Sequence, residues 1–85
     1  MTGDSMAPLF EAKAEAERAH RRYGLFNSSH EGFGVLTEEV MELLHAIHGN
    51  DLEAMRREAI QVAAVALRLA AHCRDHAEFA ERSGT

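Results

Sequence analysis

The stretch SSHEGFGVLTEEVMELLHAIHG, residues 28–49, decides the fold. Its large apolar side chains recur three or four positions apart, which is the spacing of one face of an α-helix. Ser28 and Glu31 stand three residues apart at the start, as in a capping box, and Gly49 follows the last turn. The stretch therefore predicts an amphipathic helix over about 28–49. Its expected core face consists of Phe33, Leu36, Val40, Leu43, Leu44 and Ile47.

A helix is also expected before this segment, from about Pro8 to Tyr23. Proline favours the first helical position, and Gly24 can terminate the last turn. The apolar residues of this helix form one narrow stripe, whose alanines favour close packing against another helix. The stripe consists of Leu9, Ala12, Ala16, Ala19 and Tyr23.

A third helix is expected after Asn50 or Asp51, either of which can cap it, and should run to about Arg74. Residues 75–82 either continue this helix or form a short fourth one. The helix is apolar around most of its circumference, and such a helix is usually buried inside a bundle. The apolar positions are Met55, Ala59, Val62, Ala63, Val65, Ala66, Leu67 and Leu69.

The length of the chain limits what it can build alone. A chain of 85 residues buries only about 60% of its unfolded surface, and its single cysteine excludes an intrachain disulfide, so oligomerisation is expected. We predict an all-α fold, a bundle of three to four helices per chain, in one domain over 1–85. Residues 1–7 and 83–85 are expected to be flexible.

Composition excludes several classes of function. The net charge of −5 argues against nucleic-acid binding. No stretch approaches the length of a membrane span, and the N-terminus lacks the basic and apolar regions of a secretory signal. A single cysteine, Cys73, fits a reducing cytoplasmic location.

Four glutamates fall within twelve positions of the central helix, with no lysine or arginine three or four residues after any of them. Glu31, Glu38 and Glu42 fall roughly opposite the apolar face, and Glu39 lies at its edge. Such glutamates are most often a solvated helix surface. Glu39 and Glu42 can nevertheless point to one spot, and neighbouring carboxylates repel each other unless a cation lies between them.

Glu58 falls on an apolar face of the third helix, where an unpaired carboxylate is costly to bury. Two explanations are open. Glu58 forms a salt bridge with Arg56, Arg57 or an arginine of another helix, or it joins Glu39 and Glu42 around Mg²⁺ or Mn²⁺, which prefer oxygen ligands. The polar residues that follow on the same side are Gln61, Arg68 and His72.

Two segments, RYGLFNSSHEGFGVLTEEVMELLHAI over 22–47 and REAIQVAAVALRLA over 57–70, resemble the MazG-like nucleotide pyrophosphohydrolases, especially the short phage-type members. The family pattern is E-E-x-x-E on one helix and E-x-x-D on the next. Here the first part reads Glu38-Glu39-x-x-Glu42. The second reads Glu58-x-x-Gln61, with glutamine in place of aspartate. The resemblance covers about residues 8–74.

The resemblance implies an all-α homodimer or homotetramer with a four-helix core. It implies metal-dependent hydrolysis of a nucleoside triphosphate between the α- and β-phosphates, giving the monophosphate and pyrophosphate, with dGTP or GTP as the expected substrate. It also implies Mg²⁺ or Mn²⁺ held by Glu39, Glu42 and Glu58, with Glu38 orienting or deprotonating the attacking water. The alternative is a non-catalytic helical oligomerisation or interaction module whose acids are surface charge.

The remaining site assignments concern the metal shell and the substrate. Gln61 is either a weaker metal ligand or a hydrogen-bonding partner of the nucleotide. Arg68 is the expected phosphate-binding cation, and His30 either contacts the nucleotide or helps the helix to start. Glu31 is expected to contact the substrate or to compensate for Gln61, and Phe33 is either a core residue or a contact of the base.

Two histidine pairs also suggest a zinc site, but neither pair has further ligands nearby. The pairs are His45 with His48, and His72 with His76 around Cys73.

Overall fold

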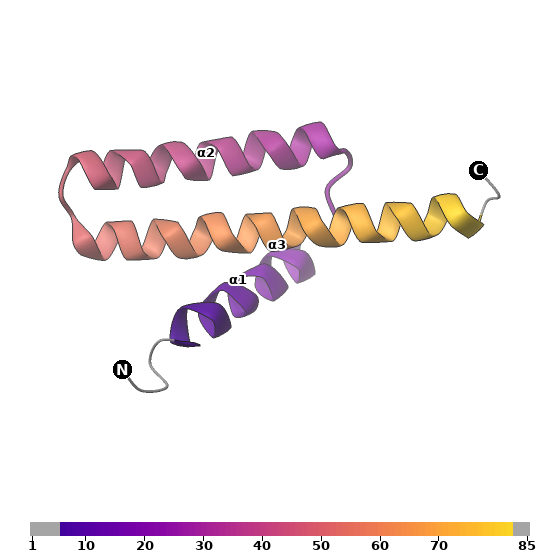
Figure 1. The fold of residues 1–85 in the computed structure, drawn as a ribbon, viewed down its shortest axis with the longest axis horizontal. Coiled ribbons are helices and arrows are strands. Elements are labelled where there is room, and N and C mark those ends of the chain that lie inside the picture. The colour runs from indigo at the N-terminus through magenta and orange to yellow at the C-terminus, as the bar shows by residue number, and fades with distance from the viewer. Residues whose placement is uncertain (1–5, 83–85) are drawn as a thin grey trace.

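The computed structural model describes the backbone of residues 6–82 and the side chains of residues 6–75. Over this range the chain forms three helices and no strand: α1 (Ala7–Tyr23), α2 (Ser29–His48) and α3 (Leu52–Arg82). Figure 1 shows α2 and α3 as an antiparallel pair, with α1 crossing α3 obliquely on the other side. The all-α prediction is confirmed, and residues 75–82 continue α3 instead of forming a fourth helix.

The helix ends follow from local chemistry. Gly24 adopts φ 74°, which glycine tolerates best, and its N–H donates to the carbonyl of His20. The Ser28 hydroxyl accepts the N–H of Glu31 at 3.1 Å, as the capping box predicts. The Glu31 carboxylate, however, accepts from the backbone and side-chain amides of Asn27, one residue before the usual partner. Of the two residues predicted to cap α3, Asp51 is the one that accepts the N–H of Ala54, at 3.0 Å.

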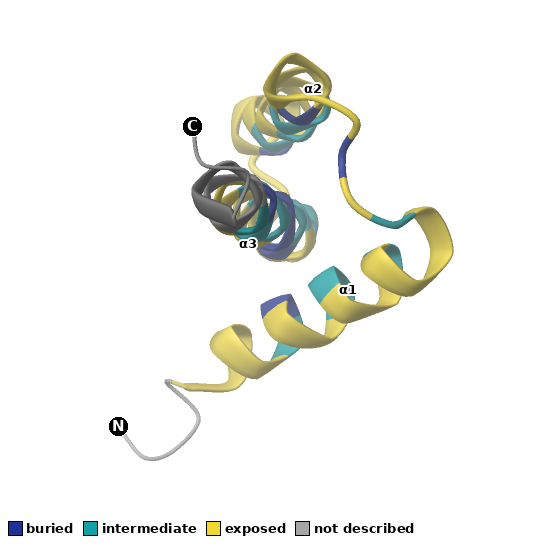
Figure 2. Ribbon diagram, turned by 90° about the vertical axis from the view of Figure 1, so that its right-hand side faces the viewer, coloured by how far each residue is buried: buried dark blue, intermediate teal, exposed yellow. Residues whose placement is uncertain are grey.

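α3 packs against both α1 and α2. Within the described residues, no Cα atom of α1 lies within 8 Å of one in α2. Figure 2 shows α1 as a mostly exposed helix whose buried residue faces α3. That residue is Ala12, whereas Leu9 and Tyr23, at the ends of the predicted stripe, are exposed. Only the small residues of the stripe are therefore used for packing.

α2 turns a different face to α3 than the apolar spacing predicts. Its buried residues are Gly32 and Ala46, and the residues half-buried between them are Val35, Leu36, Glu39 and Leu43. Phe33 is 65% exposed, and Val40, Leu44 and Ile47 are exposed as well. For a single chain the predicted core face is thus wrong at four of its six positions, and only Leu36 and Leu43 lie on the packed side. The reason is that small residues let the helices approach closely: a Cβ on Gly32 would lie only 2.7 Å from Cδ1 of Leu69.

α3 is also less buried than its composition predicts. Ile60, Ala64 and Val65 are buried, but four of the predicted core positions are exposed: Ala59, Ala63, Ala66 and Leu67. His72 is buried with its ring 6.4 Å from that of Phe26 in an edge-on arrangement. One chain therefore covers only part of the apolar surface of α3.

Two further expectations concern the ends and the membrane. Residues 1–5 and 83–85, most of the segments expected to be flexible, lie outside the described residues, and Ala7 already belongs to α1. None of the described helices combines the length and the hydropathy that crossing a membrane requires.

Candidate divalent-cation site

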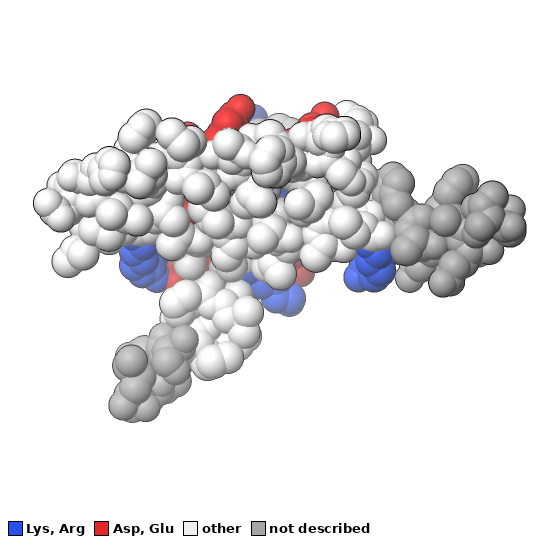
Figure 3. All heavy atoms as spheres, turned by 45° about the horizontal axis from the view of Figure 1, so that its top comes forward, with Lys and Arg blue, Asp and Glu red and all other residues white. Residues whose placement is uncertain are grey.

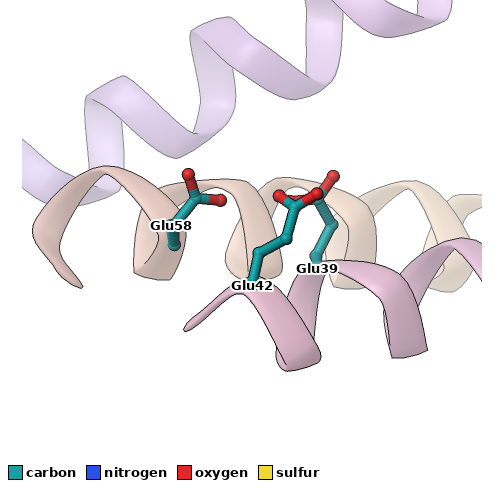
Figure 4. Close-up of side chains that lie close together, drawn as sticks. All are labelled: Glu39, Glu42 and Glu58. Carbon is teal, nitrogen blue, oxygen red and sulfur yellow. The ribbon is translucent and has the colours of Figure 1, made fainter. Parts of the chain in front are cut away.

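Three of the predicted metal ligands meet in the structure. Glu39 and Glu42, one turn apart on α2, and Glu58, on the adjacent part of α3, each offer a carboxylate oxygen, and these oxygens all lie within 4.8 Å of one another. The close-up in Figure 4 shows all three carboxyl groups directed toward the side on which α1 crosses. We call these residues the carboxylate cluster. Among the described residues they form the one such group, and the pair His45 and His48 belongs to none. The side chain of His76, in the second predicted histidine pair, lies outside the described residues.

The carboxylate cluster is electrostatically unfavourable without a cation. Burial raises the pKa of Glu39 above its ordinary value, and the charges of Glu42 and Glu58 raise this pKa further. The Oε2 atom of Glu39 is buried and has no hydrogen-bond partner. Arg57 offsets part of the charge, because its Nε lies 3.6 Å from a carboxylate oxygen of Glu58. The predicted salt bridge of Glu58 is therefore present together with the cluster.

The donor set fits a hard divalent cation. Three carboxylates from two helices supply oxygen ligands alone, which suits Mg²⁺ or Mn²⁺ better than zinc, for which histidine and cysteine are the usual partners. The exposed edge of the cluster leaves room for water or phosphate oxygens to complete the coordination. Glu42 is exposed, whereas Glu39 and Glu58 are half-buried.

Gln61 does not belong to the carboxylate cluster. Its Nε2 donates to Oε2 of Glu15 on α1 at 3.1 Å. The other oxygen of Glu15 forms an ion pair with Arg18. Sequence reasoning missed Glu15, because its partner on α3 stands 46 positions away and no local pattern points to it.

A cleft of about 340 Å³ opens between α1 and α2, with α3 as its floor. Glu39 and Gln61 line it, so the carboxylate cluster lies at its edge. Three arginines also line it: Arg18 and Arg22 from α1, and Arg68 from α3. The cleft therefore combines acids that can hold a cation with arginines that can bind an anion.

Arg68 occupies a defined position in the cleft. Its guanidinium carbon lies 4.4 Å from the centroid of the Phe26 ring, which is buried in the loop between α1 and α2. Its Nε is buried without a hydrogen-bond partner. The contact with Phe26 positions the guanidinium group at the wall of the cleft.

The other predicted site residues lie outside the cleft. Glu38 is exposed, and its charge contributes to the raised pKa of Glu39, but it is not part of the carboxylate cluster. Hydrogen bonds from Asn27 hold the pKa of Glu31 below its ordinary value and occupy its carboxylate with helix capping. His30 and Phe33 are exposed at the start of α2. Of the four predicted substrate contacts, Arg68 alone lines the cleft.

Comparisons of the chain with protein-family models, with curated proteins and with solved structures found no match.

Proposed function

We propose that the chain is a divalent-cation-dependent hydrolase that cleaves a nucleoside triphosphate between its α- and β-phosphates. The observation that carries this proposal is the convergence of Glu39, Glu42 and Glu58 beside a cleft that three arginines line. A polyphosphate needs both features, because cations must neutralise its charge and hold it in place. The choice of bond comes from the resemblance to MazG-like pyrophosphohydrolases, as does the weaker expectation of dGTP or GTP.

In this proposal each part of the site has a separate task. Glu39, Glu42 and Glu58 would hold Mg²⁺ or Mn²⁺, which when bound would neutralise phosphate charge and acidify water. Arg68 donates hydrogen bonds to phosphate oxygens from its position on Phe26. Glu38, exposed beside the carboxylate cluster, accepts a proton from the attacking water.

We further propose that the chain works as a homodimer or homotetramer. The exposed face of α2 carries Phe33, Thr37, Val40, Leu44 and Ile47, whose spacing alternates between four and three residues. We call this row the α2 seam. Such a repeat is typical of a helix that packs against another helix along its length. Few charged side chains appear on the face of Figure 3, in which α2 comes forward. Two copies joined by this seam would complete a four-helix core of α2 and α3 pairs. We place this oligomer in the cytoplasm.

The same seam favours the second candidate function, a non-catalytic oligomerisation module. The two candidates differ in their response to Mn²⁺ and nucleotides. An enzyme of the proposed kind should melt at a higher temperature with Mn²⁺, because a ligand that binds only the folded state stabilises it. It should also release pyrophosphate from at least one nucleotide in a panel of the eight common ribo- and deoxyribonucleoside triphosphates. If Mn²⁺ does not raise the melting temperature and no nucleotide yields pyrophosphate, the chain is the non-catalytic oligomerisation module.

A further inference from the structure

Glu15 is the centre of a small polar network that joins α1 to α3. One of its carboxylate oxygens accepts a hydrogen bond from Nε2 of Gln61, and the other pairs with Arg18. The Glu15 side chain is only 28% exposed, whereas that of Arg18 is 62% exposed. A half-buried carboxylate therefore pairs with the terminal Nη1 of an exposed cation.

The network lies in the wall of the cleft. Glu15, Arg18 and Gln61 all line it, together with Glu39 of the carboxylate cluster. An exposed arginine normally loses side-chain entropy when it binds a ligand. Because the ion pair with Glu15 already restrains Arg18 where it lines the cleft, part of this entropy has been lost before a ligand arrives.

The identity of residue 61 agrees with this arrangement. Glutamine can donate an N–H to Glu15, whereas an ionised aspartate offers only acceptors and would repel the Glu15 carboxylate. The glutamine that departs from the E-x-x-D pattern is thus matched to an acid on α1. The hydrogen bond between Gln61 and Glu15 joins α1 to α3 at this wall of the cleft.

We propose that Glu15 is a positioning residue that, held by Gln61, directs Arg18 toward the phosphate chain of a polyphosphate bound in the cleft. This inference rests on the proposed function for its choice of ligand. It adds that α1, through Arg18, contributes to phosphate affinity although α1 has no residue in the carboxylate cluster. Neither Glu15 nor Gln61 touches the reacting atoms in this scheme.

The test uses variants that leave the net charge unchanged, because removing Glu15's charge would itself strengthen the attraction of an anion. Glu15→Asp shortens the side chain so that it cannot reach both partners, and Gln61→Met removes the N–H donor. Glu17→Asp is the matched control, since Glu17 pairs with Lys13 at 3.6 Å and does not line the cleft. Circular dichroism confirms that each variant is folded.

Binding of inorganic tripolyphosphate in the presence of Mn²⁺ is measured by calorimetry. We expect Glu15→Asp and Gln61→Met to bind it about tenfold more weakly, the size of one lost charge-assisted contact, while Glu17→Asp stays close to the wild type. For the nucleotide that the wild type hydrolyses, KM should rise and kcat should be retained. A purely structural role would lower the active fraction, and hence kcat, without this change in KM.

Three results would overturn the inference: wild-type affinity in both cleft variants, an equal loss in Glu17→Asp, or no tripolyphosphate binding by the wild type. Arg18→Gln is a second check, because it removes the cation and keeps the Glu15–Gln61 hydrogen bond. Unchanged binding in that variant would also refute the inference. If binding depends on Glu15 but no nucleotide is hydrolysed, the positioning role is supported and the proposed enzymatic function fails alone.

Discussion

At the scale of single residues, Glu39 carries the clearest sign of a functional role. It is half-buried among two other acids, and burial raises its pKa before their charges add to the effect. A chain that needed only stability would gain by replacing such a carboxylate, because an acid that resists ionisation opposes folding near neutral pH. The loss of stability caused by this carboxylate is explained if its oxygens bind a cation.

The raised pKa predicts how stability varies with pH in the absence of metal. Above the ordinary value of 4.5, an unfolded glutamate is ionised while folded Glu39 still holds its proton, so the folded state binds more protons. The free energy of unfolding should therefore fall as pH rises from about 4.5 through the raised pKa. Urea denaturation in EDTA at several pH values measures this. The Glu39→Gln variant should lack this contribution to the pH dependence of the free energy of unfolding. If the free energy of unfolding varied with pH in the same way in both proteins, the prediction would be contradicted.

Glu58→Gln should abolish turnover and leave a folded protein. Glutamine keeps the shape but removes the charge that holds the cation, so Mn²⁺ should no longer raise the melting temperature. Glu53→Gln, an exposed position in the first turn of α3, is the control and should behave like the wild type. If Glu58 serves only its ion pair with Arg57, activity will survive and stability will fall instead.

At the scale of elements, α2 shows how much of the structure its sequence predicts. The helix ends and the closeness of Glu39 to Glu42 could be predicted, because Ser28, Gly49 and the E-E-x-x-E spacing act locally. The place of Glu58 beside them was expected from the resemblance to MazG-like proteins. The face of α2 that packs on α3 could not be predicted. Gly32 and Ala46 give a weak hydropathy signal, and the large side chains of the α2 seam dominate the pattern although they are exposed.

The contact at Gly32 can be tested by two alanine substitutions in the same helix. A Cβ at Gly32 would lie 2.7 Å from Leu69 and 3.0 Å from the buried ring of Phe26, whereas one at Gly34 would meet nothing within 4 Å. Gly34→Ala should stabilise the protein by up to about 1 kcal/mol through helix propensity. Gly32→Ala should destabilise it by about 1 kcal/mol or more through overpacking. Urea denaturation measures both, and equal effects would show that the close approach of α2 and α3 does not matter.

Contacts between distant segments were beyond prediction for another reason. The hydrogen bond between Glu15 and Gln61 depends on how α1 crosses α3, and neither residue carries a local signal of it. The same holds for Arg68 on Phe26, which joins a helix to a loop. Sequence reasoning chose Arg68 as a phosphate ligand from its place beside Glu58, and could not foresee that Arg18 and Arg22 line the same cleft.

At the scale of the whole molecule, exposed apolar surface is the dominant feature. Phe33, Leu44, Ile47 and Leu67 are all exposed in a chain of 85 residues, which is more than a small monomer usually tolerates. We therefore expect that sedimentation at micromolar concentration finds no stable, folded 9.4 kDa species. A folded monomer would refute the oligomer.

The α2 seam makes this prediction specific. Leu44→Glu should dissociate the oligomer or unfold it, because a carboxylate would have to be buried in an apolar interface. His45→Glu introduces the same charge at an exposed position next to the seam and should leave the oligomer intact. Equal sedimentation of the two variants would show that the copies associate through another surface.

The isolation of α1 from α2 has a consequence for how the chain opens. α1 buries one residue, Ala12, and is held to α3 mainly by that packing and by the polar contacts of Glu11 and Glu15. A helix with so little burial unfolds locally at a small fraction of the cost of global unfolding, so its amide protons should exchange early. A molecule bound between α1 and α2 would bridge two helices whose described Cα atoms all lie more than 8 Å apart. Protection of the amides of α1 from hydrogen exchange would then report directly how often the cleft is filled.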